Sequence, residues 1–357
     1  MKTGAALILF IGVLAVSSSV QAKSECQEWQ LHWRTFRQNY ISPEGRVYAD
    51  EASRSHSEGQ VYSLFFALVA NDPALFETIL HWTQIHLAQG KLNERLPAWS
   101  WGRREDGTWG VLDDNSASDA DLLLAYILGE SSRLWHKPGH AALSKSVAHN
   151  ILRDETRFLP GLGLLVLPGK TGFSGPPWKL NPSYYPAFAL RRLAALQSPE
   201  WKKILESSYR LLAMAAPNGI EPDWVFYGDQ GMYGQTKGSY DAIRTYLWAG
   251  MDHSTQGRAF TARVQPFFQL VDRLNHVPES VDPLSLHVEG IGSAGFQAAL
   301  GSVMKKQGRK IGSPAVPSGA SYYAQALSLF GTGYQATYAI GTSGELIPVW
   351  ARKKTCL

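Results

Sequence analysis

Two carboxylates stand two residues apart at the point where the chain enters a long apolar run. They are Asp119 and Asp121, and residues 122–128 follow them. Tryptophans cluster shortly before the two acids, including Trp99 and Trp101. Carboxyl groups can transfer the protons that glycosidic cleavage requires, and indole faces stack on pyranose rings. This combination is typical of a site that cleaves sugars.

The paired acids also have a structural interpretation. Ser118 could cap a helix and Asp121 could complete a capping box, favourable to the helix dipole. That role explains Asp121 better than Asp119, since residues two apart on a helix point in different directions. We therefore expect Asp121 to be structural and Asp119 to face a cleft.

A third carboxylate, Glu58, lies at the predicted start of another helix. Ser55 stands three residues before it, so the pair could be a capping box. Two features favour a functional role instead. Gly59 allows a ligand or backbone to approach closely, and His56 and Tyr62 add hydrogen-bonding groups. The sequence leaves both interpretations open.

A fourth carboxylate, Asp241, stands three residues before Arg244, so the two are neighbours on a helix. A solvent-exposed pair of this kind contributes little to stability. However, residues 245–251 are almost wholly apolar, which predicts a buried helix. A charged pair at the mouth of a buried helix favours a functional site.

The aromatic residues are candidates for sugar binding. Trp99 and Trp101 would share one side of an extended segment, either as a core wedge or as a sugar platform. Which of the two contacts sugar is open. Tyr184, Tyr322 and Tyr323 are weaker candidates of the same kind.

Composition excludes several classes of protein. The 357 residues are 45% hydrophobic and 18% charged, which predicts a large buried core. The net charge is only +4, so nothing indicates a nucleic-acid partner. Histidines are scattered without ligand spacing, and we expect no metal and no organic cofactor.

The first 22 residues have the pattern of a secretory signal peptide. Lys2 precedes an apolar stretch over residues 5–16, and a small-residue cleavage site ends at Ala22. An uncleaved membrane anchor is the alternative, but the apolar stretch is shorter than the roughly 20 residues that a span needs. We expect cleavage after Ala22, a periplasmic or secreted mature protein, and no later membrane span.

Two cysteines stand near opposite ends of the mature chain, Cys26 and Cys356. In an exported protein they could form a disulfide that ties the termini together. Two free thiols are the alternative.

The mature chain reads as helix after helix, for example over residues 29–40, 119–135 and 260–275. Short strands are predicted only at residues 164–167, 338–340 and 346–348. No linker marks a boundary, so residues 23–357 are predicted to form one domain. Helical hairpins in one large domain favour an all-α toroid. An α-solenoid would need a fixed sequence period, which is absent.

Several motifs resemble glycoside hydrolase family 8, the inverting endoglucanases, and most closely the periplasmic cellulases encoded with bacterial cellulose synthase. The motifs are Ser57-Glu58-Gly59-Gln60-x-Tyr62, Glu94-Arg95-Leu96-Pro97-Ala98-Trp99-x-Trp101-Gly102, Asn115-Ser116-Ala117-Ser118-Asp119-Ala120-Asp121, Leu167-Pro168-Gly169-Lys170, Asn181-Pro182-Ser183-Tyr184, Pro222-Asp223-Trp224 and Ser239-Tyr240-Asp241-Ala242-Ile243-Arg244. They follow one another in order over most of the mature chain. At Leu123, Ile127 and Ser131 the sequence departs from the residues that are usual in this family, but none of these differences changes a charge.

The resemblance implies an (α/α)6 barrel with a long cleft for a β-1,4-glucan, and endoglucanase activity connected with bacterial cellulose biosynthesis. An inner-membrane cellulose synthase complex is an implied partner. The resemblance also implies roles for individual residues. Glu58 matches the general acid, Asp241 the general base, Asp119 the acid that holds the sugar at the cleavage subsite, Tyr240 and Arg244 the residues beside the base, and Trp101 a sugar platform.

Overall fold

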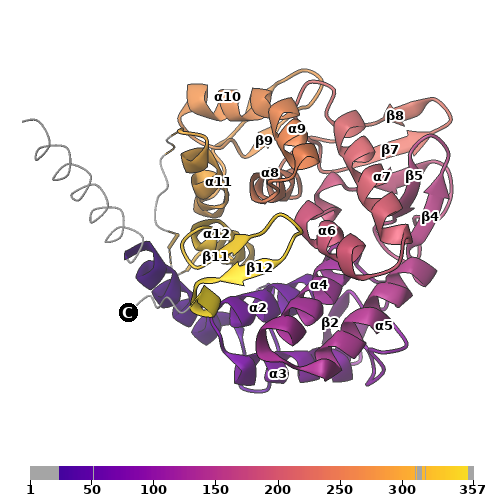
Figure 1. Cartoon of the computed structure of the whole chain (residues 1–357), viewed down its shortest axis with the longest axis vertical. Coiled ribbons are helices and arrows are strands. Elements are labelled where there is room, and N and C mark those ends of the chain that lie inside the picture. Colours follow the sequence, from indigo (N-terminus) through magenta and orange to yellow (C-terminus); the bar gives the residue numbers. More distant parts are fainter. Residues whose placement is uncertain (1–23, 51, 310, 312–315, 318, 353–357) are drawn as a thin grey trace, which may run out of the picture.

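Helices that are buried on nearly all sides surround the centre of the molecule (Figure 1). The structure is a computed structural model that describes residues 24–50, 52–309, 311, 316–317 and 319–352. The central helices are α2 (Ser57–Val69), α4 (Ser118–Trp135), α6 (Ala187–Leu196), α8 (Ala242–Met251) and α12 (Tyr322–Gly333). Every residue of α8 is buried, and Glu58 is the one residue of α2 that is not. Apolar residues all round a helix are typical of a core position.

Further helices cover this centre, most of them with one apolar face. They are a helix over residues 24–40, α3 (Pro73–Trp82), α5 (Pro138–Asp154), α7 (Glu200–Ala215), α9 (Thr255–Arg263), α10 (Gln265–Leu274) and α11 (Ala294–Lys306). Consecutive helices pack as antiparallel hairpins, as α2 with α3, α4 with α5 and α6 with α7. The helical toroid predicted from the sequence is therefore confirmed.

Local sequence explains where α3 begins. The Asp72 side chain accepts a hydrogen bond from the Leu75 N–H at 3.0 Å, and Pro73 is the first helical residue. A π-helical turn, η1 (Thr83–Leu87), continues the helix, and the chain then leaves it at Gly90 with a φ of +74°. Glycine adopts this left-handed conformation without steric cost.

One predicted helix is wrong. The sequence predicts a single helix over residues 260–275, but α9 ends at Arg263 and α10 begins at Gln265. Pro266 explains the break, because proline has no N–H to continue a helix and is favoured in the first turn of a new one.

Short antiparallel strands occupy the loops between helices. They are β1 (Ser55–His56), β2 (Ser100–Arg103), β3 (Trp109–Asp113), β4 (Thr156–Leu159), β5 (Gly163–Val166), β6 (Trp178–Leu180), β7 (Val225–Gly228), β8 (Gly231–Tyr233), β9 (Ser280–Val281), β10 (Val288–Glu289), β11 (Tyr338–Ile340) and β12 (Leu346–Pro348). The strands predicted at residues 338–340 and 346–348 are confirmed as β11 and β12, which pair with Ala339 opposite Ile347. Sequence analysis missed β1–β3 and β6–β8, which form the two three-stranded sheets.

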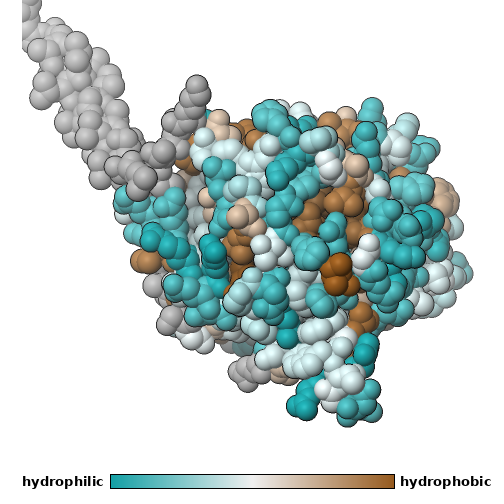
Figure 2. All heavy atoms as spheres, turned by 90° about the horizontal axis from the view of Figure 1, so that it is seen from below, coloured by the Kyte–Doolittle hydropathy of each residue, from teal (hydrophilic) through white to brown (hydrophobic). Residues whose placement is uncertain are grey.

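One connected hydrophobic core runs from Trp29 to Leu346. Aromatic contacts are dense within it: the Tyr246 and Phe267 rings stack with centroids 3.7 Å apart. The surface seen in Figure 2 is mostly hydrophilic, with hydrophobic residues in separate areas among polar ones. None of the described helices is both long and apolar enough to cross a membrane.

Two predictions concern residues outside those that the structure describes. The predicted signal peptide, residues 1–22, is one of them. The other is the disulfide, because Cys356 is outside the described residues and its proposed partner Cys26 is buried on the first helix. Both stay predictions.

Candidate active site

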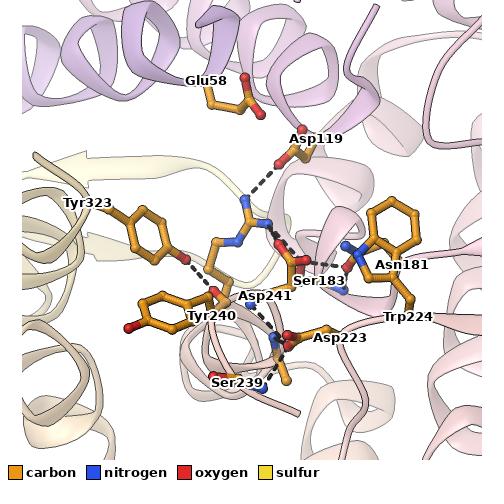
Figure 3. A network of polar contacts seen from close by, with 12 residues as sticks. Glu58, Asp119, Asn181, Ser183, Asp223, Trp224, Ser239, Tyr240, Asp241 and Tyr323 are labelled. Carbon is orange, nitrogen blue, oxygen red and sulfur yellow. Dashed lines mark hydrogen bonds and ion pairs between the residues drawn. The ribbon is translucent and has the colours of Figure 1, made fainter. Parts of the chain in front are cut away.

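The N-terminal ends of the central helices meet at one site (Figure 3). Glu58 is the second residue of α2, Asp119 is the second residue of α4, and Asp241 directly precedes α8. Tyr323 is the second residue of α12. Helix N-termini carry partial positive charge, which favours carboxylates at these positions. The fold thus brings together four residues that are far apart in the sequence.

Arg244 joins two of the carboxylates. Its Nη1 donates to Asp119 Oδ2 at 2.7 Å, and its Nη2 donates to Asp241 Oδ1 at 2.6 Å. The same guanidinium donates to the Tyr62 hydroxyl at 2.8 Å and to Ser183 Oγ at 3.0 Å. The Arg244 side chain is only 7% exposed, so this is not the weak surface pair that the sequence left open.

Asp223 holds the segment that carries Asp241. Its Oδ1 accepts hydrogen bonds from the backbone N–H groups of Ser239, Asp241 and Ala242, at 2.7, 3.1 and 2.8 Å. These N–H groups have no partner within α8, so Asp223 caps the helix from a distant segment. The sequence around Asp223 does not indicate this role, since spacing reveals no cap 18 residues away.

Glu58 accepts two side-chain hydrogen bonds. The Trp99 indole Nε1 donates to its Oε1 at 3.2 Å, and Ser57 Oγ donates to its Oε2 at 3.2 Å. Burial raises the pKa of Glu58, although these two donors and Arg244 act in the opposite direction. A carboxyl with a raised pKa can remain protonated and donate its proton.

The capping box suggested for Glu58 is wrong. Helix α2 begins at Ser57 with His56 at the N-cap, and no side chain caps it. Ser55 instead lies in β1, and its Oγ accepts a hydrogen bond from Arg46 Nε at 2.9 Å. Pairing of β1 with β2 keeps Ser55 extended, so the helix starts one residue later than the capping box requires.

The capping box suggested at α4 is wrong as well. The N-cap is Ala117, which has no side-chain acceptor, and Ser118 is already helical. Asp119 and Asp121 point in different directions, toward Arg244 and toward Glu155 respectively. Burial raises the pKa of Asp119 to about 7, against the opposing effect of Arg244. Sequence analysis did not single out Glu155.

The two tryptophans of the predicted platform do not share one side. Trp99 is 39% exposed, and its ring stacks on His56 at 5.1 Å. Trp101 is 9% exposed and packs between Trp82 and Trp109, each with its centroid 5.3 Å away. A register shift at Ser100/Trp101 explains the difference, since a β-bulge breaks the alternation of side chains along a strand.

Of the candidate tyrosines, some lie at the active site and one lies in the hydrophobic core. The Tyr323 hydroxyl donates to the Tyr240 carbonyl oxygen at 2.5 Å, and Tyr240 is 53% exposed. The Arg244 guanidinium lies over the Tyr184 ring, 5.6 Å from the centroid of that ring. Tyr322 packs against aromatic rings of the first helix instead, including Phe36. Of the two neighbouring tyrosines, Tyr323 is the one at the site.

An open hollow of about 510 Å³ adjoins the Asp223–Asp241 segment. Its lining is mostly polar, with one indole. The lining residues are Asp223, Trp224, Thr236, Lys237, Ser239, Glu279, Ser280 and Glu289. Within the described part of the chain, no group of three or more His, Cys, Asp or Glu side chains is arranged to hold a metal ion.

Comparisons with known proteins agree with this geometry. The model of the family described as "Glycosyl hydrolases family 8" matches residues 5–337. An endoglucanase of Escherichia coli O157:H7 is 39% identical over 96% of each chain, and one of Xanthomonas axonopodis is 38% identical over 95% of this chain and 94% of that one. The crystal structure of an endo-1,4-D-glucanase from Vibrio fischeri is 38% identical, with a TM-score of 0.82 over 89% of this chain and 99% of the other. The chain therefore belongs to glycosyl hydrolases family 8.

Proposed function

We propose that this glycoside hydrolase is an endo-β-1,4-glucanase that cleaves cellulose-type glucans with inversion at the anomeric carbon. The proposal rests on one observation above all: Arg244 joins the carboxylates of Asp119 and Asp241, while Glu58 stands nearby and has no salt-bridge partner among the residues that the structure describes. Such a difference in environment is what separates an acid from a base in a pair of carboxyl groups. Relatives that are endoglucanases support the choice of substrate.

In the proposed mechanism, the protonated Glu58 donates its proton to the glycosidic oxygen as that bond breaks. A water molecule on the opposite face attacks the anomeric carbon, and Asp241 removes a proton from it. Arg244 orients Asp241 through a charge-assisted hydrogen bond of 2.6 Å. The carboxylate and the acid each act once per cleavage, and no covalent intermediate forms.

Asp119 is proposed to hold the sugar at the cleavage subsite. One of its oxygens accepts from Arg244 and the other from the Ala120 N–H, so its orientation is fixed from two sides. For the sugar platform, exposure favours Trp99 over Trp101. Trp99 would then have two functions, stacking on a pyranose ring and donating a hydrogen bond to Glu58.

The cellular setting is a further part of the proposal. The pattern of residues 1–22 supports export with cleavage after Ala22, so that the enzyme acts in the periplasm or outside the cell. There it would trim glucan from an inner-membrane cellulose synthase complex. We also propose that residues 23–357 form one catalytic domain.

A substrate panel tests the proposed specificity. Purified enzyme is given carboxymethyl cellulose, xylan and chitosan, and new reducing ends are measured, with Glu58→Gln as the inactive control. We expect release from carboxymethyl cellulose far above that from the other two. Preference for xylan or chitosan would contradict the substrate, and release by Glu58→Gln equal to wild type would contradict the mechanism.

A further inference from the structure

A second pair of carboxyl groups lies behind the site, and the proposed mechanism does not use it. Asp121 is in the first turn of α4, and Glu155 directly follows α5. Both residues are 0% exposed. Their carboxyl groups are within hydrogen-bonding reach of each other. Two acids from different helices thus meet in the interior.

Hydrogen-bond donors are scarce around this pair. Ser116 Oγ donates to Glu155 Oε1 at 2.5 Å. Among the described residues, no N–H or hydroxyl reaches Glu155 Oε2 or either oxygen of Asp121. Two buried carboxylates in contact without donors would be strongly unfavourable, whereas one shared proton supplies the missing hydrogen bond.

The pair is surrounded by other acids more than by cations. Burial raises the pKa of both Asp121 and Glu155, and the neighbouring Glu155 carboxyl adds to the effect on Asp121, so that a proton is retained on the pair. The titratable groups that act on the pair are Asp119 on α4, Glu58 on α2, Asp154 at the end of α5 and Tyr185 before α6, while the Arg244 guanidinium faces Asp119.

We propose that Asp121 and Glu155 share a single proton and thereby hold one negative charge behind Asp119, and that this charge helps to retain the proton on Glu58. The two residues are positioning residues, since they act through the site without touching substrate. The inference rests on the role proposed for Glu58.

The direction of the effect follows from electrostatics. A nearby negative charge disfavours a second one and so raises the pKa of Glu58. Activity that needs protonated Glu58 is lost as the pH rises through that pKa. Removal of the charge behind the site therefore moves the alkaline limb of the kcat/KM profile to lower pH.

Three variants separate this electrostatic role from a merely structural one. In Asp121→Asn and in Glu155→Gln, one carboxylate remains and the new amide donates to it, so the single charge and the hydrogen bond are both kept. In the double variant the two amides still pair, but the charge is gone. We expect the alkaline limb to stay in place in each single variant and to move down by about one pH unit, tenfold in proton affinity, in the double variant.

Two results would overturn the inference. An unmoved limb in the double variant would mean that the pair is neutral or too remote. A shift in both single variants as large as that in the double variant would mean that the charge is not shared. If the double variant does not fold, infrared difference spectra of the two single variants against wild type at neutral pH decide, with the signal of one protonated carboxyl expected to be lost in each variant.

The infrared measurement also separates this inference from the proposed function. It is made in a Glu58→Gln background, where the catalytic acid cannot contribute a signal. A shared proton seen there would support the pair even if Glu58 proved not to be the acid. Absence of the signal would overturn the pair while leaving the role of Glu58 intact.

Discussion

The two ends of helix α4 carry buried acids in opposite electrostatic settings. Near its C-terminal end, the fully buried Glu130 accepts from Arg192 Nε at 2.7 Å, from Arg133 Nε at 3.1 Å and from the Leu346 N–H at 2.8 Å. Two cations and a backbone donor thus serve one carboxylate. These contacts join α4 to α6 and β12.

At the N-terminal end, roughly 16 Å away along the helix, the balance is reversed. Arg244 is the one guanidinium shared by Asp119 and Asp241, and Asp121 has no cation at all among the described residues. The ion pairs of Glu130 with Arg133 and Arg192 hold the fold together at the C-terminal end. Where few cations lie near buried carboxyl groups, the pKa of those groups is raised and they retain their protons. A residue that donates a proton in catalysis must be protonated in this way.

The largest expected effect comes from the site end. Glu58→Gln should reduce turnover by about 10²–10⁴-fold, because an amide cannot donate the proton. Thermal stability should be retained, since the variant replaces a half-buried acid that has no salt-bridge partner among the described residues. Reducing-end assays and thermal unfolding check both expectations. Glu206→Gln, at an exposed helix position, is the matched control, and near-normal turnover in Glu58→Gln would exclude it as the acid.

The opposite end should respond in stability instead of activity. Glu130→Gln leaves Arg133 and Arg192 without their anion, and loss of one partner of a buried ion pair costs about 3–5 kcal/mol. We expect the lower part of that range, since the Arg133 side chain is 39% exposed. Chemical denaturation measures the loss, and turnover per folded molecule should be unchanged. If the variant kept the stability of the wild type, the ion pairs of Glu130 would not stabilise the fold, and the proposed difference between the two ends of α4 would be wrong.

Trp99 and Trp101 also differ in this way, since one is expected to act in substrate binding and the other in stability. Trp101→Ala should destabilise the fold by about 3–5 kcal/mol, because a buried ring leaves a cavity. Trp99→Ala should instead weaken binding of cello-oligosaccharides by roughly tenfold, with little change in stability. Calorimetric titration on an inactive Glu58→Gln background compares the two. Loss of affinity in Trp101→Ala alone would assign the platform to Trp101.

The smallest expected effect concerns a buried acid away from both ends. Neither oxygen of the Glu221 carboxyl receives a hydrogen bond within the described part of the chain, and burial raises its pKa well above the ordinary range. The folded state therefore binds this proton more tightly than the unfolded state, so its contribution is complete below about pH 4 and is lost as the pH rises toward the folded pKa.

Glu221→Gln removes that dependence. Between about pH 6 and about pH 7, the free energy of unfolding of the variant relative to wild type should rise by about 1.4 kcal/mol. Urea unfolding at the two pH values measures the change, with Glu206→Gln as the exposed control. Parallel curves for the variant and wild type would contradict a neutral Glu221.

The sequence predicts the helical hairpins and the acids of the site for the same reason. Asp119 and Asp241 stand directly before long apolar runs, so the signal that predicts a buried helix also marks what lies at its mouth. The resemblance to a known family then supplied roles that spacing alone could not.

What the sequence missed depends on contacts between distant residues. Nothing near Glu155 indicates that it meets Asp121, and nothing near Asp223 indicates that it caps α8. The capping box at Glu58 failed because the pairing of β1 with β2 sets the start of α2, and the bulge at Ser100/Trp101 turns the two tryptophans in different directions. Strands of two to five residues have too little periodicity to be seen in a single sequence.

The stereochemistry of the product tests the central claim most directly. If Asp241 activates water while Glu58 protonates the leaving oxygen, one displacement converts a β-linkage into an α-product. Proton NMR of a fresh cello-oligosaccharide digest should show the α-anomer of the new reducing end first, before mutarotation mixes the signals. Initial appearance of the β-anomer would require a covalent intermediate and would contradict the roles of Asp241 as base and Glu58 as acid in a single displacement.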